Sequence, residues 1–160
     1  MVHEDFMRRV IDLAREGIAG RHGYPFGATV VRDGTIVGEG YNMVVSTSDP
    51  TAHAEMVAIR NAARKLNTHD LSGCDIYTNG PPCCMCLGSI LWARISRVFY
   101  TLSMKDSEDI GLPHEHLFED FSRPLDARSI PFIAMPEFDA PSRAVYDLWY
   151  ATSRQDHPQA

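Results

Sequence analysis

The 160-residue sequence contains few lysines and no cluster of basic residues. Only Lys65 and Lys105 are lysines among the fifteen basic side chains, and the formal net charge is −6. Proteins that bind the phosphates of nucleic acids are usually basic, because their cationic side chains displace the counterions of the nucleic-acid backbone. This charge balance therefore argues against a nucleic-acid partner.

Long hydrophobic runs are also missing. The longest uncharged stretch, 76–93, is interrupted by Asn79-Gly80-Pro81-Pro82, which is typical of a strand followed by a buried helix and not of a membrane span. The first ten residues carry charges and lack the apolar core of a signal peptide. We therefore expect no membrane partner and a cytoplasmic location.

Cysteine is scarce and clustered. Three of the four cysteines, Cys83, Cys84 and Cys86, lie within four residues, and Cys74 precedes them. In a chain without a sign of export, such a cluster indicates metal binding or redox chemistry before it indicates disulfide bonds.

The overall composition is that of one globular domain over 1–160, since 44% of the residues are hydrophobic and 22% are charged. We expect 103–126 to be acidic and rich in loops. The residue pattern predicts helices at 4–19, 51–66 (capped by Asp49, with Pro50 first), 83–93 and from Pro141, and strands at 28–32, 35–45, 75–79, 97–102 and 130–135. A hairpin followed by β-α-β units predicts an α/β fold, a three-layer α/β/α sandwich with a mixed five-stranded sheet.

Two predicted helix starts carry residues that suit a metal. Cys83 and Cys86 are three residues apart, so both sulfurs can point to one position, and His53 can add a nitrogen. Two thiolates and one imidazole suit Zn²⁺, and three protein ligands leave a fourth position for water, as in catalytic zinc sites. Glu55, two residues after the histidine, can exchange a proton with that water.

Two interpretations of these motifs without a catalytic zinc remain open. The Cys-x-x-Cys pair alone could be a redox dithiol. It could also be half of a structural zinc site, which would need a fourth ligand from Cys74, Cys84, His114 or His116. The joint pattern H-x-E…P-C-x-x-C favours a catalytic zinc of the nucleobase deaminase type.

Several motifs resemble one family closely. DPTAHAE (49–55) and PCCMC (82–86) are similar to the cytidine deaminase-like superfamily, in the same order and at a typical spacing. Further stretches resemble its bacterial guanine deaminase branch: PFGA (25–28), SDPTAHAEMVAIR (48–60), CMCLGSILWAR (84–94) and SIPF (129–132). The resemblance covers nearly the whole chain.

This resemblance implies a reaction and roles for single residues. The reaction is the hydrolytic deamination of a purine base, guanine to xanthine with release of ammonia, by a homodimer acting on a small nucleobase. The C-terminal helix and tail, 141–160, can be exchanged between subunits. The implied roles are one Zn²⁺ per chain on His53, Cys83 and Cys86, proton transfer by Glu55, and base contacts by Phe26, Asn42 and the backbone N–H of Ala54.

Two departures from that branch concern the segment that covers the substrate. His114 stands where guanine deaminases place an acidic residue, and Glu115 could take that role with a shift of one residue. The terminal aromatic residue has no clear equivalent in 153–160. The alternatives are a deaminase of another amino-heterocycle or nucleoside (guanosine or a cytosine-type base), a tRNA adenosine deaminase, and a structural zinc or interaction module.

Overall fold

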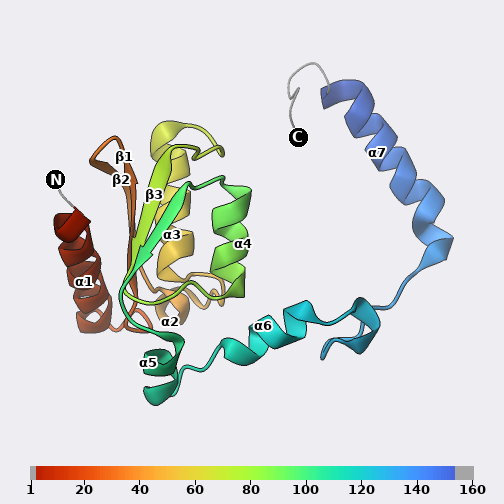
Figure 1. Ribbon diagram of the computed structural model, residues 1–160. Helices are drawn as coiled ribbons and strands as arrows, with labels where there is room; N and C mark the ends of the chain where they lie inside the picture. The colour runs from red at the N-terminus through yellow and green to blue at the C-terminus, as the bar shows by residue number, and fades with distance from the viewer. Residues whose placement is uncertain (1–2, 154–160) are drawn as a thin grey trace. The chain divides into compact units, whose positions relative to one another are not determined.

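The computed structural model describes residues 3–153, which divide into two compact units after Ser122 (Figure 1). No helix in the described part of the chain is both long enough and apolar enough to cross a membrane. The tail 154–160, part of the segment that we expect to be exchanged, lies outside the described residues.

The first unit is built on a four-stranded mixed sheet with the order β2-β1-β3-β4. Strand β1 pairs antiparallel with both β2 and β3, whereas β3 and β4 are parallel. Asp33 and Gly34 join β1 to β2 with positive φ angles of 50° and 72°, as a tight hairpin turn requires. The strands are β1 (Gly27–Arg32), β2 (Thr35–Tyr41), β3 (Cys74–Thr78) and β4 (Arg97–Tyr100).

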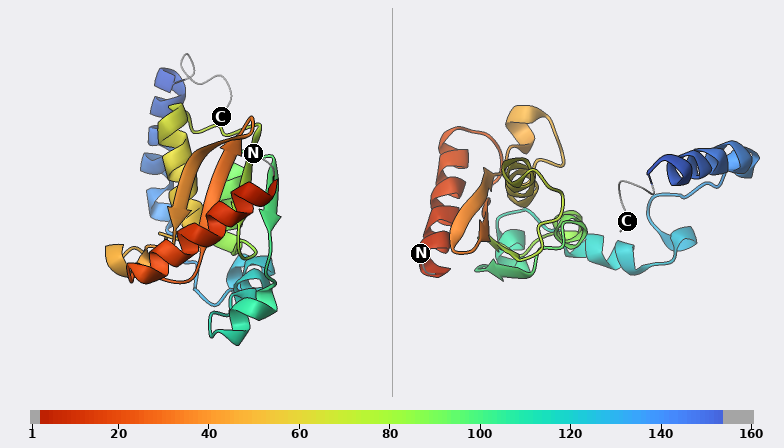
Figure 2. Two further views of the ribbon diagram at one scale, coloured as in Figure 1. Left: turned by 90° about the vertical axis from the view of Figure 1, so that its left-hand side faces the viewer. Right: turned by 90° about the horizontal axis from the view of Figure 1, so that it is seen from above.

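Helices cover both faces of this sheet (Figure 2). Helix α1 (His3–Ala19) buries Phe6 and Val10 against Val31 and Tyr77 on one face. Helices α3 (Ala54–Leu66) and α4 (Cys84–Trp92) pack on the other face, where the larger core cluster contains alanines of α3 and Ile90 of α4. The predicted α/β fold with a mixed sheet is confirmed.

The predicted fifth strand is wrong for the described residues, because 130–135 is not paired with any strand. Pro131 has no N–H to donate to a neighbouring strand, and Pro136 follows directly. The second unit instead contains two short 3₁₀ helices, η1 (Leu125–Ala127) and η2 (Pro136–Phe138), and helix α7 (Asp139–Ser153).

Other boundaries also differ from the prediction. The strand expected over 35–45 ends at Tyr41, and a short helix, α2 (Val44–Thr47), follows it. The segment 103–126, expected to be mostly loop, contains α5 (Met104–Asp109) and α6 (Glu115–Ser122). Ser103 and Asp106 form a reciprocal capping box at the start of α5, a local signal in the sequence that predicts a helix start.

Two glycines let α3 lie directly on β2. A Cβ atom at Gly40 would lie 2.6 Å from the carbonyl oxygen of Ala54, and one at Gly38 would lie 2.3 Å from that of Ala58. Both contacts are with helix backbone, which cannot move aside as a flexible side chain can. The position of α3, and so of the residues at its start, depends on this close approach.

We predict that Gly40→Ala lowers the free energy of unfolding by about 1–3 kcal/mol, because the added methyl group pushes against the backbone of α3. Thr35→Ala, an exposed position on the same strand, is the control and should change it by less than about 0.5 kcal/mol. Denaturant-induced unfolding measures both. Equal effects of the two substitutions would contradict the close-packing explanation.

Candidate metal centre and active site

His53 and Glu55 are positioned by the loop that leads into α3. Asp49 does not cap the helix as predicted, because its carboxylate accepts hydrogen bonds from the N–H (2.8 Å) and the hydroxyl (2.7 Å) of Thr51. These bonds form an Asx turn at 49–51. The helix begins only at Ala54, with His53 as an extended N-cap residue. The imidazole therefore projects from just before the helix, and Glu55 lies in its first turn.

Cys83 and Cys86 are placed by the start of α4. Cys83 is the extended N-cap residue, and its carbonyl accepts the N–H of Leu87 at 2.8 Å. Cys86 is one turn further along and fully buried. Both sulfurs therefore lie at the N-terminal end of α4, where the helix dipole favours thiolates.

The three side chains converge on one point. His53 Nδ1 is 3.6 Å from the Sγ of Cys83 and 3.6 Å from the Sγ of Cys86. With bonds of about 2.3 Å to sulfur and about 2.0–2.1 Å to nitrogen, a tetrahedral zinc ion would hold such S and N atoms about 3.6 Å apart. The donor set and its spacing thus fit zinc.

No fourth ligand joins this cluster among residues 3–153. Cys74, Cys84, His114 and His116, which the sequence leaves open as a fourth ligand, are not part of it. A structural zinc site is closed by four protein ligands, whereas a catalytic site keeps one position for water or substrate. The described residues therefore form the open kind of site.

The ligand side chains share protons in the absence of a metal. Hydrogen bonds from Cys86 and from His53 lower the pKa of Cys83 to about 4. The Cys83 thiolate in turn raises the pKa of His53, and its hydrogen bond with Cys86 together with burial raises the pKa of Cys86. Hydrogen bonding within the metal-free cluster therefore favours the thiolate form of Cys83 and the charged form of His53.

Glu55 is a buried carboxyl group next to this cluster. The residue is 5% exposed, and burial raises the pKa of Glu55 because the low-dielectric surroundings disfavour the charged form. Hydrogen bonding with Cys86 works in the opposite direction but is the smaller effect. A raised pKa makes the protonated form of the carboxyl group more accessible, which a group that passes protons on requires.

A cavity of about 240 Å³ opens onto the metal ligands and Glu55. This is below the ~300–1,000 Å³ that is usual for pockets of drug-sized ligands, so the space suits one small ring system. Leu112, Pro113 and His114, in the segment between α5 and α6, form part of the cavity wall. The cavity is lined by Tyr24, Phe26, Asn42, His53, Glu55, Pro81, Cys83, Leu112, Pro113, His114 and Leu117.

Asn42 presents an amide group to this cavity. It is almost fully buried, and its Oδ1 accepts the backbone N–H groups of Tyr24 (3.1 Å) and Val44 (3.2 Å). These two bonds fix the orientation of the carboxamide. Both bonds use Oδ1 and none within the described part of the chain uses Nδ2, which leaves a donor for a ligand.

The remaining predicted base contacts have different positions. Phe26 is half-buried in the cavity wall. Ala54 is fully buried and does not line the cavity, but its backbone begins α3 beside His53. His114 lines the cavity, although its Nε2 is buried without a partner among residues 3–153, whereas Glu115 is exposed and outside the lining.

Sequence reasoning missed five of the eleven residues that line the cavity. Tyr24 and Pro81 adjoin motifs that were recognised, so their proximity was available as a signal. Leu112, Pro113 and Leu117 carry no pattern that distinguishes a cavity wall from an exposed loop.

We predict that Cys83 in the metal-free protein is alkylated by iodoacetamide more than about tenfold faster than Cys84 at about pH 6. The reason is that the pKa of Cys83 is lowered to about 4, so it is a thiolate at this pH, whereas burial raises the pKa of Cys84. Peptide mass spectrometry measures both rates, and added Zn²⁺ should protect Cys83. Similar rates at the two cysteines would contradict the proton-sharing description.

Comparisons with known proteins agree with this geometry. The guanine deaminase of Bacillus subtilis is 42% identical over 146 residues, which cover 90% of this chain and 94% of that protein. A solved structure of guanine deaminase from Bacillus subtilis matches with a TM-score of 0.85 at 41% identity, covering 92% of this chain and 95% of that one.

Two further relatives are more distant. The tRNA-specific adenosine deaminase of Haemophilus influenzae is 39% identical over 119 residues, which cover 74% of this chain and 68% of that protein. A solved structure of a mutant protein in complex with 8-azaguanine is 34% identical with a TM-score of 0.67, covering 77% of this chain and 68% of that one. The family described as the cytidine and deoxycytidylate deaminase zinc-binding region matches residues 1–102, and the chain belongs to this family of zinc-binding deaminases.

Proposed function

We propose that the protein catalyses the hydrolytic deamination of guanine to xanthine and ammonia, with one zinc ion per chain. The observation that carries this proposal is the open His53, Cys83 and Cys86 cluster beside a buried Glu55, in a cavity sized for one ring system. The likeness to guanine deaminases over nine tenths of the chain supports guanine as the base.

Glu55 moves the protons of this reaction. Zinc, when it is bound, would make a water acidic enough to lose a proton near neutral pH, so that its oxygen can attack a ring carbon. The Glu55 carboxylate accepts a proton from the attacking water and delivers it to the ring nitrogen next to that carbon. It then accepts the remaining proton of the hydroxyl group now on that carbon and passes it to the exocyclic amine, which leaves as ammonia as the C–N bond breaks and the carbonyl forms. The raised pKa of Glu55 favours the protonated state that this delivery needs.

Phe26, Asn42 and Ala54 position the base in this proposal. The ring of Phe26 offers an apolar face on which a purine can stack. The fixed carboxamide of Asn42 offers Nδ2 as a donor to a purine nitrogen or oxygen. The backbone N–H of Ala54 at the start of α3 is oriented like the other free donors of a helix N-terminus.

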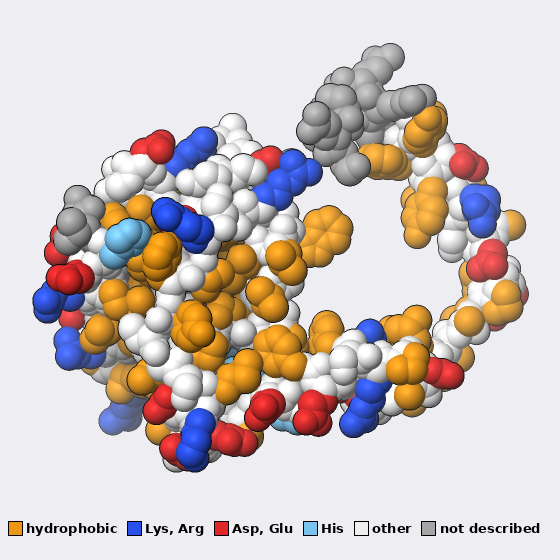
Figure 3. Space-filling view, viewed as in Figure 1, with side chains coloured by type: hydrophobic (Ala, Val, Ile, Leu, Met, Phe, Trp, Pro, Cys, Tyr) orange, Lys and Arg blue, Asp and Glu red, His pale blue; other side chains and the backbone are white. Residues whose placement is uncertain are grey.

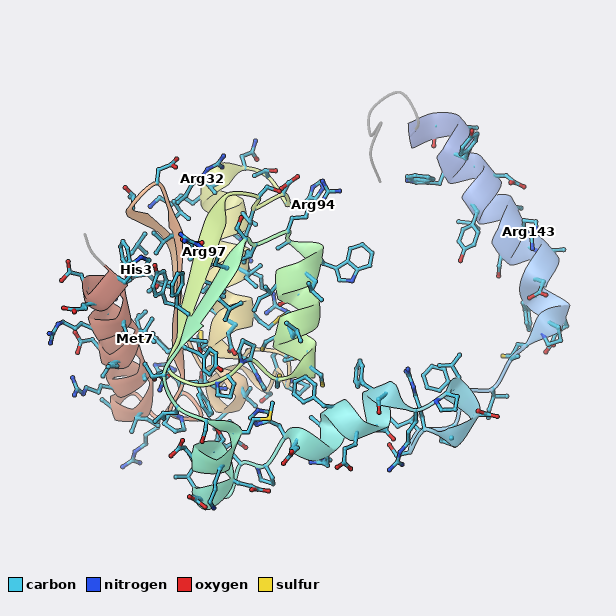
Figure 4. All side chains as sticks on the ribbon, in the orientation of Figure 1. His3, Met7, Arg32, Arg94, Arg97 and Arg143 are labelled. Carbon is cyan, nitrogen blue, oxygen red and sulfur yellow. The ribbon has the colours of Figure 1, made fainter. Side chains whose placement is uncertain are left out.

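Charge and cavity shape favour a free base over tRNA. Acidic side chains lie along α5 and α6, at the end of the sheet where the cavity opens (Figure 3). The arginines Arg32, Arg94 and Arg97 lie at the other end (Figure 4), where Arg94 pairs with Asp70 and Arg97 with Asp75. Phosphates approaching the cavity would meet negative charge, whereas a neutral base would not.

A related amino-heterocycle is the second candidate substrate, because His114 and Glu115 differ from the pattern of the guanine deaminase branch. His114 lines the cavity where guanine deaminases are expected to place an acidic group. In our proposal His114 shapes the wall beside the base, and Glu115, one residue further along the chain, supplies the acidic group.

We further propose a homodimer in which the C-terminal helix and tail, 141–160, are exchanged. Helix α7 carries exposed apolar side chains, among them Val145 (63% exposed), Leu148 (65%) and Trp149 (48%). A helix with such an apolar stripe is normally covered by another element or chain. Light scattering of the purified protein tests the dimer.

The substrate proposal is tested by ammonia release from a panel of guanine, guanosine, cytosine, cytidine, adenine and a tRNA. We expect guanine to have the highest kcat/KM, by at least about tenfold, because a cavity of about 240 Å³ suits one small ring system. A preference for guanosine or tRNA would refute the free-base proposal. Activity on another base alone would keep the mechanism and change the substrate.

Glu55→Gln should reduce kcat by about 10²–10⁴-fold, because an amide of the same shape cannot accept and return the proton. About one zinc per chain should remain, since Glu55 is not a member of the ligand cluster. Steady-state kinetics and elemental analysis measure the two quantities. Near wild-type turnover in this variant would remove Glu55 from the mechanism.

A further inference from the structure

Asn79 sits where three strands end near the cavity. It follows the last residue of β3, and its backbone carbonyl accepts a hydrogen bond from the hydroxyl of Thr101, just past the end of β4, at 3.1 Å. Its side chain reaches toward the start of β1. The metal-ligand loop that leads to Cys83 begins with the next residue, Gly80.

The Asn79 carboxamide continues the hydrogen bonding between β1 and β3 by one residue pair beyond the end of their backbone pairing. The pairing of β1 with β3 ends at Ala28 and Thr78. Beyond it, Asn79 Oδ1 accepts the N–H of Gly27 at 2.9 Å, and Asn79 Nδ2 donates to the carbonyl of Pro25 at 2.9 Å. One rigid side chain thus binds the backbone on both sides of Phe26.

We call the two hydrogen bonds from the Asn79 side chain to Pro25 and Gly27 the Asn79 clamp. Further backbone contacts fix Phe26, which lies between these two residues. The carbonyl of Phe26 accepts the N–H of Asn42 at 2.9 Å from the other side. A Cβ atom at Gly80 would lie 3.0 Å from Cε1 of Phe26, so the ring lies directly against the Gly80 backbone. The position of the ring relative to the metal-ligand loop therefore depends on residues 79 and 80.

We propose that Asn79 is a positioning residue for substrate, which holds Phe26 in the cavity wall through the two backbone groups that flank it. This inference rests on the proposed function, because the ring is assigned there to stack on the base. Asn79 does not line the cavity, so its effect on substrate passes through Phe26. Such an effect changes binding of the base more than the proton transfers at Glu55.

Asn79→Ala should raise KM for guanine about tenfold, the equivalent of about 1.4 kcal/mol, with kcat changed by less than about twofold. Zinc content should stay at the wild-type level. Asn61→Ala is the matched control, because Asn61 also bonds a backbone carbonyl, that of Glu39 at 2.9 Å, and does not line the cavity. KM in the control should equal that of the wild type.

The effect of Asn79→Ala on KM should also be measured in a protein that already carries Phe26→Ala. If Asn79 acts through Phe26, adding Asn79→Ala to Phe26→Ala should change KM by less than about twofold. An undiminished tenfold rise in this double variant would overturn the proposal, because it would show a general structural role. An unchanged KM in the single Asn79→Ala variant would overturn it as well.

A readout without substrate separates this inference from the proposed function. Amide hydrogen exchange of the peptide containing Gly27 should be faster in Asn79→Ala and unchanged in Asn61→Ala, since Gly27 loses its acceptor only in the former. Unchanged exchange at Gly27 would overturn the clamp. A wild-type protein inactive on guanine would overturn the proposed function, while the clamp would still be decided by exchange.

Asn79→Asp covers the case in which the alanine variant does not fold. It has the same shape and keeps an acceptor for Gly27, but it has no donor for the carbonyl of Pro25. KM should rise in this variant, by less than in a folded alanine variant. A wild-type KM would show that the bond to Pro25 has no role and would overturn the two-sided clamp.

Discussion

The convergence of two helix N-termini at one end of the sheet is the constraint on which the site depends. His53 precedes α3 and Cys83 precedes α4, and each is the extended N-cap residue of its helix. Because both helices pack on the same face of the sheet, their starts can meet in one place. Two helix dipoles then favour the thiolates and stabilise negative charge that develops during a reaction. Moving either helix by a small distance would open the spacing of 3.6 Å that suits a metal.

The chemistry at this point could be predicted from the sequence to a large extent. The ligands His53, Cys83 and Cys86 are predictable because a metal demands particular atoms, and few residue types supply them. The geometry confirms this cluster. The strands and buried helices of residues 27–100 follow from hydrophobic pattern and turn residues, and the Asp33-Gly34 hairpin is an example of such a local signal.

Other features depend on contacts that a local pattern does not reveal. The hydroxyl of Thr51 donates a hydrogen bond to the carboxylate of Asp49. Asp49 therefore does not act as the N-cap of α3 that the sequence predicts. The run 130–135 has strand-like residues, but a strand needs a partner edge, and the pairing depends on the placement of distant chain segments. The cavity wall from Leu112 to Leu117 is likewise defined only by what it faces.

The Asp33-Gly34 hairpin has a practical consequence. Both residues are exposed and the space around the tip is open, so the side chain of Asp33 is accessible, whereas the positive φ of Gly34 disfavours a side chain at that position. Strand β1 separates this tip from Phe26 by six residues, or about 20 Å of extended chain. A fluorophore or a surface-coupling group attached at this hairpin would sit on a rigid arm and leave the entrance for small molecules unobstructed, which suits the protein to immobilisation as a sensor element.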